Sequence, residues 1–288
     1  MRDFRVALAQ IDPALGDIRA NLDLHLRTIE SAREAGAGVV VFPELSLTGY
    51  VLRDQVADLA EAVDGPTIAR LARATGDIDV VAGFAEDGPG HRFFNSAVHL
   101  AGGQLVHVHR KAYLPDYGLF EEGRDFARGD VLRAFDTATS GRCGIATCED
   151  LWHATTAWIL AQDGADVLFV PSSGPSRGAR DDSGPGSVAV WRELLRMTAR
   201  FQTTYVVYVN RVGFEDGLNF GGGSMVVDPF GREVASLEPL EPGLAVVDLY
   251  DEVLRRARTA YPLLRDTDLE LVSRELGRIR RSRFDLPE

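Results

Sequence analysis

The stretch VVVFPE, residues 39–44, is a short apolar run that stops at a proline and a glutamate. A run of this kind is typical of a strand buried within a sheet. Helical patterns lie on either side of it. In residues 17–36 apolar side chains recur at helical spacing up to a glycine, and residues 65–76 carry a proline near the start and a glycine at the end. The alternation of strand and helix predicts an α/β fold.

The same alternation continues along the chain. The patterns predict further strands at residues 5–11, 79–86, 95–100, 104–110, 142–150, 166–173, 204–211, 223–231 and 244–249. They predict helices at residues 155–164 and 188–203, with a polar, glycine-rich loop at residues 176–187. This number of strands is large for one open sheet in a chain of this size, so we expect two packed sheets. No linker divides the chain, so we expect a single domain over residues 1–288 whose residues 251–288 form a charged helical tail.

The acidic composition limits the partners of this protein. The net charge is −12 and the isoelectric point is about 5.0, whereas nucleic acid and anionic membranes attract clustered positive charge. We therefore expect neither as a partner. The sequence has no apolar run of about 20 residues that would span a bilayer, and it starts without the apolar segment of a signal peptide. Cys143 and Cys148 lie on one predicted strand, so we expect free thiols and a cytoplasmic location.

Three predicted strands end in side chains that can do chemistry. Glu44 ends the first, Lys111 follows the strand at residues 104–110, and Cys148 ends the apolar part of residues 142–150. Strand ends in α/β folds deliver side chains into a common crevice. A carboxylate, an ammonium and a thiol together form a working set: the carboxylate accepts the thiol proton, the thiolate attacks a carbonyl carbon, and the ammonium faces the developing oxyanion.

Lys111 stands out because it is the only lysine among the 31 lysine and arginine residues. A solvated surface cation could equally have been an arginine, as it is elsewhere in this chain. An ammonium is a compact point donor, whereas a guanidinium is a broad planar fork. A small site that holds one oxygen atom requires the former.

Several of these residues also fit purely structural roles. Glu44 could be an ordinary carboxylate at a strand end, and Trp152 could wall a pocket or belong to the core. Cys143 fits a small buried apolar side chain. His107 and His109 share one face of a predicted strand, but no third ligand stands at a fitting spacing. We therefore predict packing or surface roles for the two histidines, and no metal site.

The segments around the three strand ends resemble the motifs of the nitrilase, or carbon-nitrogen hydrolase, superfamily. They are FPELSLTGY (42–50), HRKAYLP (109–115) and ATCEDLW (146–152), and the resemblance extends over about residues 4–250. It implies a catalytic set of Glu44, Lys111 and Cys148 joined by a second glutamate. It also implies a four-layer αββα sandwich, with two mixed sheets face to face and helices outside. Such domains commonly form homo-oligomers by stacking their helices, and they need no metal or organic cofactor.

The segments CEDLW, LPDYGLFEEGRDF (114–126) and FVPSSGPSRG (169–178) are most similar to the glutaminase domain of glutamine-dependent NAD synthetase. That enzyme continues into a synthetase domain with a Ser-Gly-Gly phosphate loop, which these 288 residues lack, so the resemblance does not carry NAD synthesis over. In register with the glutaminase pattern, the second glutamate is Glu122 rather than its neighbour Glu121. The resemblance predicts that the substrate lies among Glu149, Tyr117, Phe120, Trp152, Ser172, Ser173 and Arg177.

The sequence thus predicts a cofactor-free thiol amidohydrolase that hydrolyses a non-peptide C–N bond of a small molecule through a cysteine thioester. The expected substrate is a primary carboxamide, either glutamine-like or an ω-amide, and the products are a carboxylate and ammonia. Glu44 is the expected base, Cys148 the nucleophile, and Lys111 with the backbone N–H of Glu149 the oxyanion donors. Hydrolysis of an N-carbamoyl amine is an alternative that uses the same groups. An inactive binding or scaffold partner of a separate synthetase is the alternative outside enzymes.

Overall fold

The computed structural model describes residues 1–177, 180–181 and 184–284. Its first sheet contains β1 to β5 and a late strand, β16, in the order β16-β1-β2-β3-β4-β5. The bounds are β1 Phe4–Gln10, β2 Val39–Val41, β3 Asp79–Gly88, β4 Arg92–Ala101, β5 Gln104–Arg110 and β16 Gly243–Leu249. Strands β1, β2 and β3 run parallel, and β4, β5 and β16 are antiparallel to their neighbours. The sheet is therefore mixed.

The second sheet is built in the same way, in the order β15-β14-β11-β8-β7-β6. The bounds are β6 Phe135–Thr137, β7 Gly141–Ile145, β8 Val167–Ser172, β11 Tyr205–Asn210, β14 Met225–Val227 and β15 Glu233–Ser236. Its central strands β7, β8 and β11 are parallel, and antiparallel strands flank them. Both sheets are mixed, as predicted.

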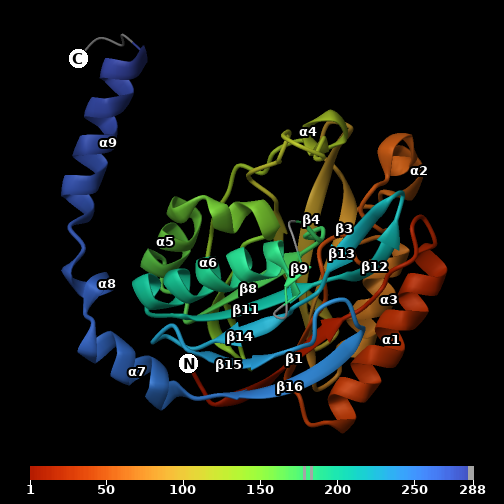
Figure 1. Ribbon diagram of the computed structural model, residues 1–288, viewed down its shortest axis with the longest axis horizontal. Coiled ribbons are helices and arrows are strands. Elements are labelled where there is room, and N and C mark those ends of the chain that lie inside the picture. The colour runs from red at the N-terminus through yellow and green to blue at the C-terminus, as the bar shows by residue number, and fades with distance from the viewer. Residues whose placement is uncertain (178–179, 182–183, 285–288) are drawn as a thin grey trace.

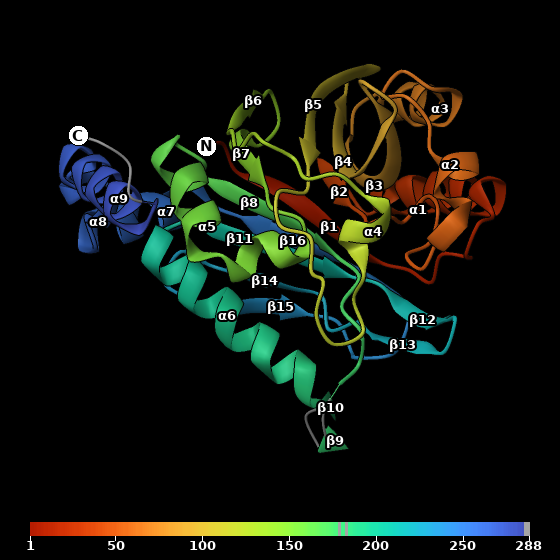
Figure 2. The ribbon, with the colours of Figure 1, turned by 90° about the horizontal axis from the view of Figure 1, so that it is seen from above.

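Helices cover the outer face of each sheet, which completes four layers (Figure 2). Helices α1 (Ile18–Glu34) and α3 (Pro66–Thr75) lie on the first sheet, and α5 (Ala154–Gln162) and α6 (Gly186–Gln202) on the second. One apolar cluster lies between the sheets and joins valines of β1, β2 and β3 to side chains of β8 and β11. Two others lie under the helix pairs. The predicted αββα sandwich is confirmed.

Short elements connect these layers. They are η1 (Arg53–Gln55), α2 (Val56–Leu59), α4 (Glu122–Asp125), η2 (Cys148–Trp152), the hairpin of β12 (Val212–Glu215) with β13 (Leu218–Gly221), and the pair β9 (Arg180–Asp181) with β10 (Gly184–Pro185). The pair β9–β10 falls in the segment that we predicted as a loop, and residues 178–179 and 182–183 of that segment lie outside the described residues. Of these elements, α4 carries Glu122, η2 carries Cys148 and the β12–β13 hairpin carries Glu215.

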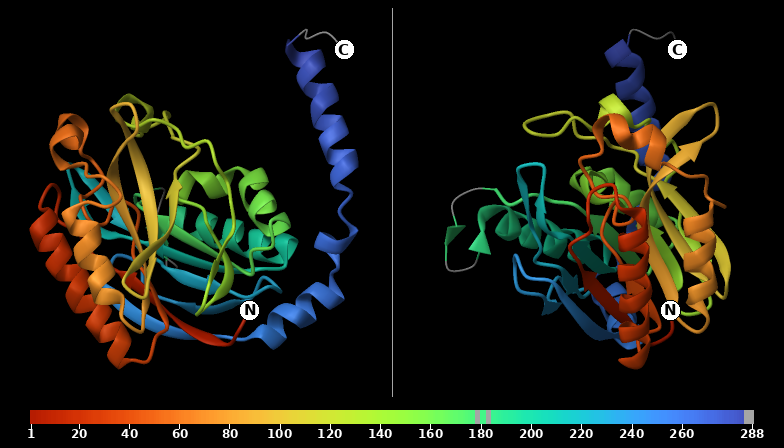
Figure 3. Two further views of the ribbon diagram at one scale, coloured as in Figure 1. Left: turned by 180° about the vertical axis from the view of Figure 1, so that it is seen from behind. Right: turned by 90° about the vertical axis from the view of Figure 1, so that its right-hand side faces the viewer.

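The C-terminal residues form α7 (Asp251–Ala260), α8 (Leu263–Asp266) and α9 (Leu269–Phe284). The last of these extends away from the sandwich, as Figures 1 and 3 show from opposite sides. The predicted helical pattern of the tail is thus present. Within the described ranges, no helix combines the length and the apolar character needed to cross a bilayer.

Two predicted strand ends are wrong, and both corrections concern the site. Strand β2 ends at Val41 instead of reaching Glu44, because Pro43 has no N–H with which to continue the ladder. Strand β7 ends at Ile145, because the N–H of Thr147 donates to Asp150 and not to a neighbouring strand. Glu44 and Cys148 therefore lie on turns just beyond their strands, where their side chains are free to leave the plane of the sheet.

Candidate active site

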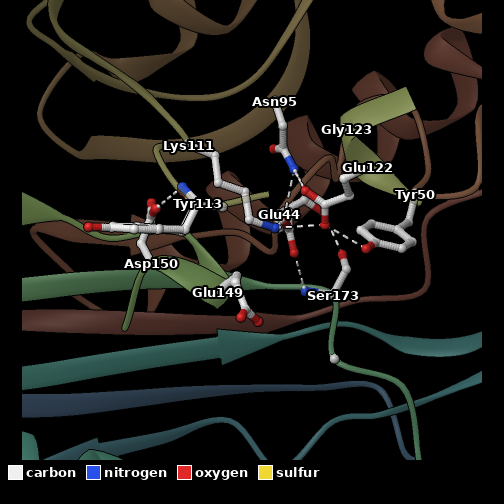
Figure 4. A network of polar contacts seen from close by, with 12 residues as sticks. Glu44, Tyr50, Asn95, Lys111, Tyr113, Glu122, Gly123, Glu149, Asp150 and Ser173 are labelled. Carbon is white, nitrogen blue, oxygen red and sulfur yellow. Dashed lines mark hydrogen bonds and ion pairs between the residues drawn. The ribbon is translucent and has the colours of Figure 1, made fainter. Parts of the chain in front are cut away.

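The ends of β2 and β5 bring Glu44 and Lys111 into contact, and α4 adds Glu122 (Figure 4). The Lys111 ammonium lies 2.6 Å from Glu44 Oε1 and 2.7 Å from Glu122 Oε1. All three side chains are buried. The turn after Glu44 rests directly on β3, where a Cβ at Gly83 would lie 2.3 Å from Leu45 N. Only glycine fits there, so Gly83 helps to place Glu44.

Polar groups around the two carboxylates fix their orientation. The Asn95 side chain donates to Glu44 Oε1 at 2.8 Å, and the Ser173 N–H donates to Oε2 at 2.8 Å. The Tyr50 hydroxyl donates to Glu122 Oε1 at 2.6 Å. Sequence reasoning missed Tyr50 and Asn95, although Tyr50 closes the quoted FPELSLTGY motif and Asn95 opens the strand predicted at residues 95–100. Groups held from several sides in this way are preorganised for chemistry.

The hairpin β12–β13 holds the backbone of Tyr50 in place. Glu215, at the end of β12, accepts the backbone N–H of Tyr50 at 2.8 Å. The buried guanidinium of Arg211 pairs with Glu215 and lies 4.1 Å from the Phe220 ring. The hairpin was not predicted as a pair of strands, so its link to the site emerges only from the tertiary structure.

The cluster buries two carboxylates beside one ammonium, and this imbalance sets the pKa values. Burial raises the pKa of Glu122 to about 7, although Lys111 opposes the shift. Burial alone would lower the pKa of Lys111, but the charges of Glu122 and Glu44 outweigh it and raise that pKa well above its usual value. Lys111 therefore stays charged at neutral pH.

Cys148 opens the 3-10 helix η2 in a left-handed conformation, with φ of 47°. This conformation is uncommon for a residue with a side chain, and it is characteristic of sharp turns at functional sites. Burial raises the pKa of the Cys148 thiol well above its ordinary value, the charge of Glu44 raises it further, and Lys111 lowers it. The resting group is therefore a neutral thiol, and it needs a base before it can act as a nucleophile.

Asp150 ties the turn of Cys148 to the end of β5. Its Oδ1 accepts the N–H groups of Ala112 and Tyr113, each at 2.9 Å, and its Oδ2 accepts the N–H of Thr147 at 3.0 Å. His109 Nε2 lies 2.7 Å from the same Oδ2. The aspartate is fully buried. One carboxylate thus fixes the spacing between the segment that carries Lys111 and the segment that carries the thiol.

We expect Asp150→Asn to lower kcat by about tenfold to a hundredfold, because a misplacement of 1 Å in a reacting group has an effect of that size. In the variant, the NH2 group of the asparagine faces backbone N–H groups that donate to a carboxylate oxygen of Asp150 in the wild type. The thermal midpoint should fall as well, so kcat is measured well below the new midpoint. Asp163→Asn is the matched control, because Asp163 also accepts a backbone N–H, at 2.7 Å from Ala134, but outside this cluster. Equal losses of kcat in the two variants would contradict the positioning role.

A cavity of about 550 Å³ opens beside Cys148. Its walls are mainly aromatic and apolar, and its charged groups are a glutamate and an arginine. The lining residues include Tyr117, Phe120, Cys148, Glu149, Trp152, Pro175, Arg177, Val190 and Trp191. The size and the mix of apolar walls with a few polar groups are typical of a pocket for a small molecule.

Arg177 and Glu149 give this cavity two opposite charges. The Arg177 guanidinium lies 4.4 Å from the centre of the Phe120 ring. Its Nε and Nη2 are buried, and neither has a hydrogen-bond partner among the residues that the structure describes. Glu149 accepts a hydrogen bond from the Tyr117 hydroxyl at 3.0 Å, and burial raises its pKa. Buried polar groups in proteins are normally hydrogen-bonded, so these two nitrogens are candidates to bind an acceptor on a small molecule in the cavity.

The structure also gives positions for the remaining glutamate, serine and cysteine residues that the sequence analysis discussed. Of the two adjacent glutamates, Glu122 reaches Lys111, whereas Glu121 is exposed. Ser172 and Ser173 are buried and are not among the residues that line the cavity. The Ser173 hydroxyl donates to the backbone oxygen of Glu44 at 2.8 Å. The contact of the two serines with a substrate stays a prediction. Cys143 lies in the cluster between the sheets, and burial raises the pKa of its thiol to about 12.

The two histidines set aside at the sequence level differ from each other. His107 stacks on Phe135 with ring centres 4.2 Å apart, in the predicted packing role. His109 is also packed inside the protein, but its bond to Asp150 makes it part of the site's support. Across the described ranges, no group of three or more His, Cys, Asp or Glu side chains is arranged to hold a metal ion.

The sequence is similar to a family of enzymes and to individual proteins of known sequence. The family model for carbon-nitrogen hydrolases matches residues 5–259. The (R)-stereoselective amidase of Pseudomonas sp. is 36% identical over 272 residues, which are 93% of this chain and 92% of that protein. The glutamine-dependent NAD(+) synthetase of Thermotoga maritima is 31% identical over 261 residues, which are 88% of this chain and 44% of the synthetase. The chain therefore spans less than half the length of that relative.

A solved structure of an amidase is similar over nearly the whole chain. It is a mutant of the amidase from Nesterenkonia sp. AN1, with 27% sequence identity and a TM-score of 0.78, and the match covers 94% of this chain and 96% of that one. In that structure the acetamide moiety of fluoroacetamide has added covalently to the active-site cysteine.

Proposed function

The chain belongs to the carbon-nitrogen hydrolase family, and we propose that this enzyme converts a primary carboxamide into a carboxylate and ammonia through a thioester on Cys148. The observation that carries the proposal is the Lys111 ammonium, buried between Glu44 and Glu122, whose charges act on the thiol of Cys148 at the wall of a cavity. The covalent adduct on the cysteine of the Nesterenkonia amidase supports the same role for Cys148.

In the first half of the reaction, Glu44 removes the proton from the Cys148 thiol as the sulfur attacks the amide carbon. Oε1 of Glu44 already accepts from Lys111 and Asn95, whereas Oε2 accepts from Ser173 N and keeps a second lone pair for the proton. Oε2 can therefore accept the thiol proton without giving up any of these hydrogen bonds.

The tetrahedral intermediate places a negative charge on the former carbonyl oxygen. Lys111 donates to that oxygen, together with the backbone N–H of Glu149, which belongs to the first turn of η2 and has no partner within the helix. Glu44 returns its proton to the nitrogen, and ammonia leaves. The same carboxylate then activates a water molecule that hydrolyses the thioester and restores the thiol.

The two charges of the cavity support an amide that also carries an α-amino acid group, such as glutamine. A carboxylate on the substrate would accept from the unpaired nitrogens of Arg177, and an ammonium group would lie against Glu149 and Tyr117. The aromatic walls would contact the methylene groups between that end and the amide. A purely apolar amide would leave Arg177 without a partner.

An ammonia-release assay tests this function directly. The purified protein is given glutamine, asparagine, longer ω-amides of amino acids, simple apolar amides, N-carbamoyl amines and nitriles, and both ammonia and the carboxylate product are measured. We expect the largest kcat/KM for an ω-amide of an amino acid. A preference for N-carbamoyl amines or nitriles would contradict the carboxamide proposal, and turnover of none of these compounds would contradict the catalytic one.

On the preferred amide, we expect Arg177→Ala to raise KM by about tenfold to a hundredfold, with a smaller change in kcat. The reason is that a hydrogen bond to a charged group contributes about 1.5–3 kcal/mol, and this one forms far from the reacting carbon. Arg192→Ala is the control. Arg192 is an arginine of α6 that does not line the cavity and that pairs with Glu233. An unchanged KM for Arg177→Ala would remove the residue from the substrate site.

A further inference from the structure

Two buried hydroxyl groups, those of Ser172 and Tyr208, lie close to the Cys148 thiol. Ser172 is the last residue of β8, and Tyr208 lies on the neighbouring parallel strand β11, where it pairs with Val170. Side chains two residues apart on a strand point to the same face of the sheet. Ser172 therefore shares with Val170 and Tyr208 the face that α5 and α6 cover (Figure 2), and Cys148 belongs to the apolar cluster on that face.

Neither hydroxyl has a well-formed hydrogen bond in the resting structure. Both side chains are completely or almost completely buried, and neither oxygen has a hydrogen-bond partner among the residues that the structure describes. Ser172 is nevertheless near enough to influence two neighbours. Burial raises the pKa of the Cys148 thiol and of the Tyr208 phenol, and the Ser172 hydroxyl lowers the pKa of each. The three groups are thus within reach of one another without being aligned.

Packing alone does not account for a tyrosine at position 208. Its ring stacks on Trp191 with ring centres 4.7 Å apart, and Trp191 lines the cavity. A phenylalanine would make the same stack without burying an oxygen that lacks a partner, which costs free energy. Burial keeps the Tyr208 hydroxyl protonated at neutral pH by raising its pKa. A hydroxyl rotates about its C–O bond, so its proton can turn toward a charge that forms nearby.

We propose that Ser172 and Tyr208 form a donor relay for the sulfur of Cys148, in which Ser172 donates to the thiolate and Tyr208 donates to Ser172. The relay rests on the proposed role of Cys148 as the nucleophile. The neutral thiol of the resting enzyme is a weak acceptor, whereas the sulfur gains negative charge as its proton leaves. Hydrogen bonds that form only with that charged state lower the barrier. Because one hydrogen bond polarises the next, Tyr208 strengthens the bond that Ser172 makes.

The same relay acts again when the thioester is hydrolysed. Water attacks the thioester carbon and gives a proton to Glu44, the carbon–sulfur bond breaks, and its electron pair stays on the sulfur of Cys148. Ser172 donates to that sulfur until Glu44 passes the proton to it and restores the thiol. Ser172 is thus a catalytic residue, because it contacts a reacting atom, and Tyr208 is a positioning residue that acts through Ser172.

Steady-state kinetics of Ser172→Ala and Tyr208→Phe on the preferred amide are the first test. We expect Ser172→Ala to lower kcat by about tenfold, the lower end of the effect of a hydrogen bond to a charged group. Tyr208→Phe should lower kcat by about threefold to fivefold, because it acts through Ser172. Since neither residue lines the cavity, KM should stay within about twofold of the wild type. A raised KM with unchanged kcat in Ser172→Ala would place this hydroxyl on the substrate and overturn the relay.

The double variant distinguishes a relay from two separate effects. Because Tyr208 acts only through Ser172, the combination of Ser172→Ala with Tyr208→Phe should be no slower than Ser172→Ala alone. If the two losses of kcat multiplied instead, the residues would act independently, and the relay would be wrong.

Alkylation by iodoacetamide, with peptide mapping of the adduct on Cys148, measures the sulfur without any amide turnover. It therefore tests the relay whichever compound is the substrate. We expect Ser172→Ala to slow alkylation by about threefold to tenfold, because fewer thiols are ionised, although each remaining thiolate is more reactive. Alkylation at the wild-type rate in both Ser172→Ala and Tyr208→Phe would contradict a contact with the sulfur.

Tyr205 supplies the matched control. It lies on the same strand, but it faces the cluster between the sheets, and its hydroxyl donates to the backbone oxygen of Tyr250 at 3.1 Å. Tyr205→Phe should lower the thermal midpoint and leave kcat within about twofold of the wild type. Tyr208→Phe should lower kcat without lowering the midpoint, because it removes a buried hydroxyl that has no partner. Equal losses of kcat in the two variants would show a general effect of changing β11 and would overturn the relay.

Discussion

Cys148→Ala is expected to lower kcat by about 10⁴-fold or more, which is the effect of removing the nucleophile from a comparable hydrolase. The variant can still bind the amide, because the cavity walls and the charges of Arg177 and Glu149 remain. It cannot form the thioester. Because the side chain lies at the edge of a cavity, we expect only a small change in the thermal midpoint. The measurement is kcat on the preferred amide, together with the affinity of the inactive variant for that amide.

The second cysteine provides the control. Cys143 lies in the apolar cluster between the two sheets, and its thiol contacts the Ser140 hydroxyl at 3.0 Å. Cys143→Ala should therefore reduce stability and leave kcat close to that of the wild type. An electrophilic amide that traps the nucleophile should add to Cys148 alone, as peptide mapping by mass spectrometry would show. An adduct confined to Cys143, with loss of activity, would reverse the assignment.

From its residue patterns alone the sequence predicted an α/β fold with two packed sheets, and it offered Glu44, Lys111 and Cys148 as candidate reacting side chains. Apolar runs such as residues 39–41 and 167–170 have to be buried, and their alternation with amphipathic helices determines the layers. Glu44, Lys111 and Cys148 each follow such a run. The proximity of Glu44 and Lys111 follows because β2 and β5 point the same way in one sheet and end at the same edge, whereas Cys148 follows a strand of the second sheet.

The groups that hold these side chains could not be predicted in this way. Asp150 looks like the second acidic residue of an exposed Glu-Asp pair, and only the tertiary structure shows it fully buried with backbone N–H groups around it. Asn95 is one polar residue in an ordinary strand pattern. Glu215 belongs to a hairpin rich in glycine and polar residues, which gave no strand signal. Each role depends on a partner more than 30 residues away, and periodicity carries no information about such pairs.

The supporting groups explain how a lysine can remain charged in a fully buried position. Burying an ammonium is costly unless opposite charges and hydrogen bonds compensate for the lost water. Lys111 meets one oxygen of Glu44 and one of Glu122, and Tyr50 and Asn95 complete the hydrogen bonds of those carboxylates. This arrangement holds the ammonium in a fixed position as a preorganised donor for the oxyanion.

Lys111→Arg tests that interpretation, because it keeps the charge and changes only the shape of the donor. A guanidinium is a planar fork that cannot contact both carboxylates and still direct one compact donor to the oxyanion. We expect kcat to fall by about 10²- to 10³-fold, the effect of losing one oxyanion donor. The larger group must also fit a fully buried position, so the protein should lose about 1–3 kcal/mol of stability.

The neighbouring position offers the reverse exchange as a control. Arg110 ends β5, pairs with Glu86 and lies over the Phe94 ring, away from the cavity. Arg110→Lys should change stability slightly and leave kcat within a few-fold of the wild type. If Lys111→Arg, assayed well below its thermal midpoint, also worked within a few-fold of the wild type, net charge alone would suffice at position 111. The oxyanion would then need another donor, and the backbone N–H of Glu149 would be the remaining candidate at the site.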